Sequence, residues 1–131
     1  ILCEGGFSLM EEDAMDWAIL QGARRALRPR GLLIMTAPHA PFLLAQEPEA
    51  LSFDVVTLRE RFRIEATDRE GRTRDLEATQ RYYTCPELRC LLRAVGFDVV
   101  RFFAVTEAGY TFDTPPARDH FEVGAVARAS S

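Results

Sequence analysis

The sequence has no apolar run that approaches the roughly 20 consecutive residues needed to cross a bilayer. It also lacks the charged start and apolar segment of a signal peptide. Cysteine is scarce, and Cys3, Cys85 and Cys90 are odd in number and lack metal-site spacing, so we expect free thiols rather than disulfides. These absences favour a cytoplasmic protein with no membrane partner and no bound metal.

The chain also has no excess of positive charge, since its net charge is -4, so we expect no nucleic-acid partner. Its 131 residues are 47% hydrophobic and 27% charged, which is typical of one globular domain over residues 1–131. The sequence opens with Ile1 inside an apparent strand. We therefore expect it to be the later part of a longer protein.

The strongest pattern runs from Ser8 to Ala37 and predicts a helix, a tight turn and a strand. Pro29 should end the helix near Leu27, with Gly31 relieving the turn. Leu32 to Met35 do not alternate with polar residues, which is typical of a strand covered by helices. The apolar helix face is expected to contain Met15, Ile19, Gly22, Ala23, Ala26 and Leu27, and the solvent face Glu12, Asp16, Arg24, Arg25 and Arg28.

Two further local signals complete this unit. Ser8 and Glu11 form an S-x-x-E capping box, although Asp13 with Asp16 could cap a helix that starts one turn later. A preceding strand should end at residues 1–3, because helix, turn and strand make half of a βαβ unit. The expected fold class is therefore α/β.

Residues 53–83 change to a period of two and predict a long inserted β-hairpin. A turn at residues 68–71, with Gly71 left-handed, sets Ile64 opposite Leu76 on an apolar inner face. The same register places Arg59 opposite Arg81 on the outer face, where an acidic ligand or partner could bind. We expect the outer charges, Arg61 among them, to be solvated.

The remaining elements follow from clear end signals. Thr84 and Glu87 make a second capping box, and Gly96 closes the helix. Its buried stripe should contain Leu88, Leu91, Leu92 and Val95, with Leu91 central. Strands are predicted at residues 97–105 and 121–127, joined by a loop at 107–119 and therefore antiparallel.

Two loops should lie at the carboxyl edge of the sheet, where open α/β sheets bind ligands. Residues 4–7 follow the first strand, and their glycines allow close approach to a ligand or simply form a turn. Residues 38–41 form a rigid loop whose His39 is either a ligand-binding group or a solvated bystander. Residues 42–44 could cover a pocket, and Glu47 to Glu49 form a polar break.

Several stretches together resemble a known family. They are ILCEGGF at residues 1–7, ARRALRPRG at 23–31 followed by LLIMT, and RYYTCPEL at 81–88 followed by LLRAVGF at 91–97. They are similar to the later half of class I S-adenosylmethionine-dependent methyltransferases. That family usually has glycine where this chain has Arg30. The glycine-rich cofactor loop and the acidic ribose-binding residue have no counterpart here.

The resemblance implies the later half of a Rossmann-like sheet in the order 4, 5, 7, 6, with strand 7 antiparallel and the hairpin inserted. It implies transfer of a methyl group from S-adenosylmethionine to a small-molecule acceptor. Cys3, Glu4 and Gly5 would then contact the cofactor, although most cofactor contacts belong to the other half. The family's Asn-Pro-Pro-Tyr motif is not matched, which weighs against adenine or glutamine N-methylation.

Phe7, His39, Tyr82 and Tyr83 are the side chains that we place nearest the acceptor, although tyrosines beside a helix start are more often packing residues. Alignment and exclusion of water can supply much of the catalysis, because a sulfonium is a good leaving group. No catalytic residue is therefore identified. The hairpin would cover the substrate or, with an exposed sheet edge, support a homodimer.

Two other functions compete with this hypothesis. The chain could be a non-catalytic binding or dimerisation module derived from a methyltransferase fold, which the missing cofactor loop favours. It could instead be a piece of an NAD-dependent dehydrogenase, although an antiparallel last strand and a Pro-Arg-Gly turn are less typical there. The residues encoded before Ile1 would separate enzyme from module.

Overall fold

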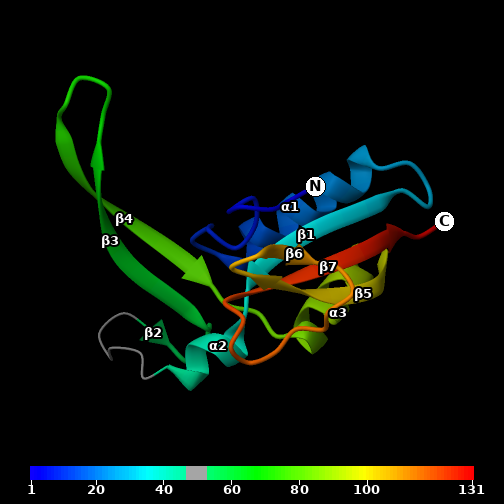
Figure 1. Ribbon diagram of the computed structural model, residues 1–131. Helices are drawn as coiled ribbons and strands as arrows, with labels where there is room; N and C mark the ends of the chain where they lie inside the picture. The colour runs from blue at the N-terminus through cyan, green and yellow to red at the C-terminus, as the bar shows by residue number, and fades with distance from the viewer. Residues whose placement is uncertain (47–52) are drawn as a thin grey trace.

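The computed structural model describes residues 1–46 and 53–131 and has a mixed α/β fold (Figure 1). The predicted polar break at Glu47 to Glu49 lies outside the described residues. None of the described helices has the length and apolar character needed to span a membrane. The elements are α1 (Asp13–Ala26), β1 (Leu32–Pro38), α2 (Ala40–Ala45), β2 (Phe53–Asp54), β3 (Arg59–Thr67), β4 (Thr73–Arg81), α3 (Cys85–Ala94), β5 (Phe97–Thr106), β6 (Gly109–Thr111) and β7 (Glu122–Ala129).

A four-stranded sheet with the order β1-β7-β5-β6 forms the centre of the molecule. β7 lies antiparallel between β1 and β5, as the absence of a helix between β5 and β7 predicted. On the other edge of β1, Leu2 makes a parallel bridge with Met35, and its N–H donates to the carbonyl of Ile34 at 2.8 Å. The strand expected at residues 1–3 is therefore present only as a single parallel bridge at Leu2. β6 falls inside the segment that the sequence predicted to be a loop.

One face of this sheet carries the main core. Alternate residues of β1 and β7 pack with Leu20 of α1 and with Leu88 and Leu92 of α3, so both helices cover the same face. The predicted apolar stripe of α3 does face the core. Leu91, however, is only partly buried and lies at the margin of the stripe, so the prediction that it is central was wrong. The three cysteines are free, as predicted.

On the opposite face of the sheet, the backbone of β7 lies very close to an aromatic ring of β5. A Cβ atom on Gly124 of β7 would lie 2.1 Å from the ring of Phe103 on the neighbouring strand β5. The Phe103 ring in turn packs against Phe112, with 4.6 Å between the ring centroids. The segment after β6 is therefore held over β5 and β7, and it carries the chain back to the carboxyl edge of the sheet.

The first turn of α1 differs from both capping predictions. The helix begins at Asp13 with Glu12 as its N-cap, and no side chain caps it. Asp16, predicted on the solvent face, is 1% exposed, whereas Met15, predicted in the core, is 49% exposed. The reason is that two polar groups from outside the helix satisfy the Asp16 carboxylate, as described below. The helix end at Ala26 agrees with the prediction.

The hairpin formed by β3 and β4 has the predicted register, with Ile64 opposite Leu76 and Arg59 opposite Arg81. Gly71 has a φ of 80° in the turn, also as predicted. The predicted faces were wrong, however, because Ile64 and Leu76 are exposed while Arg59 and Arg81 are buried. Figure 1 shows why: the hairpin projects from the body, and only its base packs against other elements. Its first strand is also interrupted, since β2 ends at Asp54 and a turn precedes β3.

The turn between α1 and β1 places a non-glycine residue in the left-handed region. Arg30 has a φ of 64°, at the position where the resembled family usually has glycine. Gly31 does not have a positive φ, so it does not relieve the turn in the way that we expected. A Cβ on Gly31 would instead lie 2.9 Å from the carbonyl oxygen of Arg28.

We expect Arg30→Gly to raise the free energy of unfolding by up to about 1 kcal/mol, because a left-handed conformation strains side chains with a Cβ. Arg25→Gly, the same change in the last turn of α1, should lower it by about 1 kcal/mol. Urea denaturation of the two variants measures both values. Destabilisation of similar size by both changes would contradict the assigned strain at Arg30.

Candidate functional site

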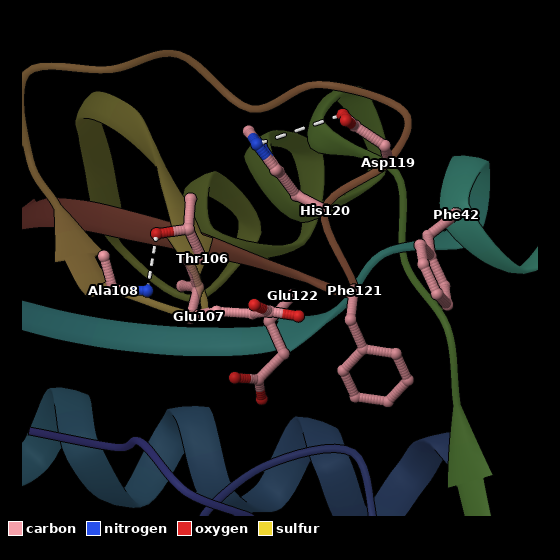
Figure 2. Close-up of a pocket in the computed structure, with 9 residues that line it drawn as sticks. Phe42, Thr106, Glu107, Ala108, Asp119, His120, Phe121 and Glu122 are labelled. Atoms are coloured by element: carbon pink, nitrogen blue, oxygen red, sulfur yellow. Dashed lines mark hydrogen bonds and ion pairs between the residues drawn. The ribbon is translucent and has the colours of Figure 1, made fainter.

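An open pocket of about 650 Å³ lies at the carboxyl edge of β1 and β5 (Figure 2). It is formed by α2, the end of β5, the segment before β7 and the first residue of β7. Parallel strands present their loops at this edge, which is where open α/β sheets bind ligands. Its lining residues are Phe42, Val105, Thr106, Glu107, Ala108, Asp119, His120, Phe121 and Glu122.

Glu122 links this pocket to the loop at residues 4–7. Burial raises the pKa of the Glu122 carboxyl, the field of the nearby Glu4 carboxylate raises it further, and the Thr36 hydroxyl partly offsets the increase. Glu4 is itself held by Tyr110, whose hydroxyl donates to a Glu4 carboxylate oxygen at 2.6 Å. The pocket and the loop after Leu2 are therefore neighbouring parts of one carboxyl edge.

The loop itself has an exposed and tightly turned backbone. Glu4 and Gly5 have φ values of 56° and 85°, and both are exposed, while Cys3 is half-buried. Residues with positive φ in succession turn the backbone sharply and leave its polar groups accessible. The three positions predicted to contact a cofactor are thus together and open to solvent.

Two of the residues predicted to contact the acceptor, His39 and Tyr82, do not line the pocket but pack against residues that do. His39 is buried; its backbone N–H donates to the Phe121 carbonyl at 2.8 Å, and its Nδ1 lies 3.3 Å from the His120 carbonyl oxygen. Burial lowers the pKa of His39, which favours the neutral ring. Tyr82 is also buried, and its ring meets that of Phe121 edge-on with 6.2 Å between centroids. Both residues hold the wall formed by His120 and Phe121.

The other two predicted residues lie in the main core. Phe7 and Tyr83 are buried and stack against each other, with 5.2 Å between ring centroids. The Tyr83 hydroxyl donates to the Asp16 carboxylate at 2.8 Å, and the Ser8 N–H donates to its other oxygen at 3.2 Å. Burial of Asp16 and Tyr83 raises the pKa of each group. These residues connect the N-terminal loop, α1 and the segment before α3.

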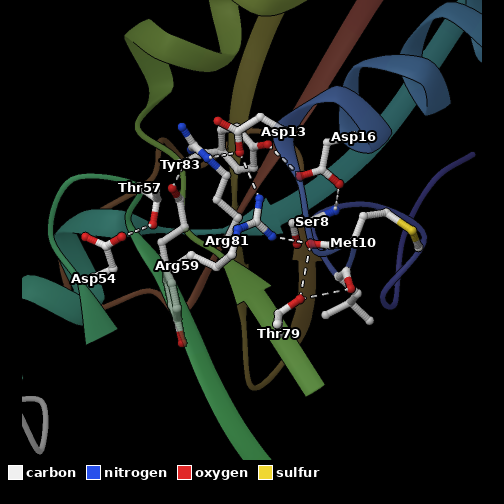
Figure 3. A network of polar contacts seen from close by, with 12 residues as sticks. Ser8, Met10, Asp13, Asp16, Asp54, Thr57, Arg59, Thr79, Arg81 and Tyr83 are labelled. Carbon is white, nitrogen blue, oxygen red and sulfur yellow. Dashed lines mark hydrogen bonds and ion pairs between the residues drawn. The ribbon is translucent and has the colours of Figure 1, made fainter. Parts of the chain in front are cut away.

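A second polar cluster fixes the hairpin base to α1 (Figure 3). One carboxylate oxygen of Asp13 lies 2.8 Å from Nη2 of Arg59 and 3.0 Å from Nε of Arg81. The Arg81 contact lacks hydrogen-bond geometry and is an ion pair. Arg81 also pairs with Glu87 at 2.5 Å, and its guanidinium lies 4.1 Å from the Tyr83 ring centroid. The predicted anion site on the outer face was therefore wrong, because both arginines are buried and pair with Asp13 and, for Arg81, with Glu87 of the same chain.

Sequence patterns missed the residues that line the pocket. Glu122 is the first residue of β7 and Phe121 precedes it, Glu107 and Asp119 belong to the segment predicted as a loop, and His120 lies between that loop and the predicted strand. Glu122 had a usable signal, because it is a single carboxylate at the start of an otherwise apolar strand. Residues 38–41 were predicted to be a rigid loop, but α2 begins at Ala40 and brings Phe42 into the pocket.

No protein-family model and no characterised protein sequence matches this chain, but solved structures match its fold. The methyltransferase CcbJ from Streptomyces caelestis aligns with a TM-score of 0.71 at 15% identity, over 98% of this chain and 55% of its own. An S-adenosylmethionine-dependent methyltransferase from Clostridium acetobutylicum aligns at 0.67 and 9% identity, over 98% and 56%.

The glycopeptide N-methyltransferase MtfA, in its complex with S-adenosylmethionine, aligns with a TM-score of 0.51 at 18% identity, over 92% of this chain and 49% of its own. The chain therefore spans about half the length of the structures that it matches. At these identities the likeness establishes the fold, which is that of S-adenosylmethionine-dependent methyltransferases.

The raised pKa of Glu122 predicts a pH-dependent change in stability. Its charged form is disfavoured in the folded state, so stability is lost as the pH rises through the folded-state pKa. Glu122→Gln should therefore stabilise the chain at pH 7, by less than about 1 kcal/mol because solvent reaches part of the side chain. The gain should disappear near pH 4.

Urea denaturation at both pH values measures this difference. Glu11→Gln, a change at an exposed carboxylate of the N-terminal loop, is the matched control and should show little effect at either pH. The contrary result would be a Glu122→Gln variant that is less stable than the unmodified chain at pH 7, with a smaller difference at pH 4. It would show that the Glu122 carboxylate is favourably solvated in the folded state.

Proposed function

We propose that this chain forms the substrate side of an S-adenosylmethionine-dependent methyltransferase that methylates a small-molecule acceptor. The observation that carries the proposal is the pocket at the carboxyl edge, directly beside the loop at residues 4–7. The fold likeness supports it, since the structures that the chain matches are S-adenosylmethionine-dependent methyltransferases. In this proposal, Leu2, β1, β7 and β5 are strands 4, 5, 7 and 6 of the family's sheet.

Cys3, Glu4 and Gly5 would contact S-adenosylmethionine in this enzyme, and the cofactor would supply the methyl group as a sulfonium. The exposed backbone of Glu4 and Gly5 fits close approach of a ligand, and the Glu4 carboxylate fits a cationic one. Most of the remaining cofactor contacts would come from outside this chain. Residues 1–131 alone should therefore bind the cofactor weakly.

The chain's own contribution to methyl transfer would be alignment of the acceptor and exclusion of water. His39 and Tyr82 would position the His120–Phe121 wall, and the contacts that both residues make with this wall support that role. Phe7 and Tyr83 stay candidates for the acceptor side, although both are buried in the main core. Such positioning can lower the barrier of a bimolecular reaction by several kcal/mol without an acid or a base.

A non-catalytic binding or dimerisation module is the second candidate. The observation that favours it is the hairpin, whose Ile64 and Leu76 are exposed opposite each other on a projecting ribbon. Exposed apolar residues on a two-stranded ribbon are suited to a second copy or to a substrate cover. The two candidates differ in whether the protein binds the cofactor.

Titration calorimetry with S-adenosylhomocysteine tests the proposal on two proteins: residues 1–131, and a longer form that includes the residues encoded before Ile1. We expect no strong heat from the first and micromolar binding by the second. Glu4→Ala in the longer form should weaken binding about tenfold, the equivalent of one charged hydrogen bond. Glu11→Ala is the control.

The outcomes separate the candidates. Absence of binding by the longer form would support the module and reject the enzyme. Micromolar binding by residues 1–131 alone would show that this chain holds a complete cofactor site, which would contradict the assignment of its strands to the later half of the sheet.

A further inference from the structure

The pocket at the carboxyl edge has an unusual charge pattern. Three of its nine lining residues are carboxylates, Glu107, Asp119 and Glu122, and Glu4 adds its field from the adjoining loop. The chain has 16 basic residues, yet none of the described residues that line the pocket is an arginine or a lysine. A pocket of this kind attracts cations and repels anions, and the effect is strongest at Glu122, which is half-buried, whereas Glu107 and Asp119 are exposed.

Aromatic rings form the other part of the lining. Phe42 and Phe121 meet edge-on, with 5.4 Å between their centroids and 84° between their planes. Figure 2 shows the two rings on one side of the pocket and the carboxylates of Glu107 and Glu122 on the other. Aromatic faces bind both the apolar body of a ligand and a cationic head.

A buried hydroxyl, that of Thr36, neighbours the Glu122 carboxylate. Thr36 is 3% exposed, and its hydroxyl makes no hydrogen bond of full geometry with any described residue. This hydroxyl acts on the Glu122 carboxylate, which lines the pocket. Thr36 does not line the pocket, so Glu122 is the member of this pair that a bound donor would reach.

We propose that this pocket binds a small molecule carrying a protonated amine, with the ammonium group between Glu122 and Glu107 and the apolar body against Phe42 and Phe121. The ammonium supplies three donors for carboxylate and hydroxyl acceptors, which are the groups that this wall offers. The inference rests on the proposed function, in which it makes the methyl acceptor an amine. A carboxylate or phosphate acceptor is disfavoured by the same charges.

The position of the pocket fits an acceptor site. Tyr110 pairs with Val105 of the pocket lining and donates its hydroxyl to the Glu4 carboxylate at 2.6 Å, and Glu4 belongs to the proposed cofactor loop. An amine held at Glu122 would therefore lie beside the place where the cofactor is proposed to bind.

The test is protein-observed NMR on residues 1–131 with three probes of similar shape: 2-phenylethylamine, 2-phenylethanol and 3-phenylpropionate. We expect saturable shifts of the pocket amides with the amine only. Glu122→Gln and Glu107→Gln should each weaken amine binding about tenfold, because each removes one nearby charge. Glu11→Gln, an exposed carboxylate outside the pocket, is the matched control and should leave binding unchanged. Amide spectra confirm that each variant is folded.

Equal binding of the alcohol or the carboxylate would overturn the inference, as would an equal loss with Glu11→Gln. Shifts away from the pocket, or displacement of the amine by sinefungin, would also overturn it, because the site would then be nonspecific or part of the cofactor site. The assay contains no methyl donor, so its failure leaves the calorimetric test of the proposed function unaffected. Amine binding without cofactor binding by the longer form would instead reject the methyltransferase.

Discussion

Two carboxylates on the first turn of α1 hold together parts of the chain that are distant in sequence. Asp16 accepts from the Ser8 N–H and the Tyr83 hydroxyl, and Asp13 pairs with both Arg59 and Arg81. The start of a helix is a favourable place for negative charge because its free N–H groups point outward. Burying the two arginines would be costly without carboxylate partners, which are Asp13 for both and also Glu87 for Arg81. The position of the hairpin and of the N-terminal loop therefore depends on this turn.

The same anchoring determines the geometry of the carboxyl edge. Once Tyr83 is fixed on Asp16, its neighbour Tyr82 is directed against Phe121, and the backbone of Tyr83 pairs with that of His39. The pocket wall is thus built on residues whose own positions are set by buried contacts. A rigid wall of this kind suits a reaction that depends on alignment. The outer part of the hairpin projects beyond this framework (Figure 1).

The sequence predicted an element well wherever its conformation is determined by residues close to one another in the chain. The register of the hairpin follows from the period of two and from Gly71, and the cap of α3 follows from Thr84 and Glu87. Burial of Asp16 was not predictable in this way, because its partners are brought to it only by tertiary folding. The pocket was missed for the same reason, since its residues come from a turn-rich segment whose path is set by packing around Phe103.

Native-state hydrogen exchange in an Asp13→Asn variant tests the anchoring most directly. The amides of Arg81 and Tyr82, which donate to the carbonyls of Ser8 and Leu58 at 2.9 Å, report on the hairpin base. Loss of the charge should speed their exchange about tenfold or more and leave the β1–β7 amides unchanged. Glu12→Gln, one residue away, should have no such effect. Unchanged rates at the hairpin base, or equal acceleration throughout the sheet, would contradict the account.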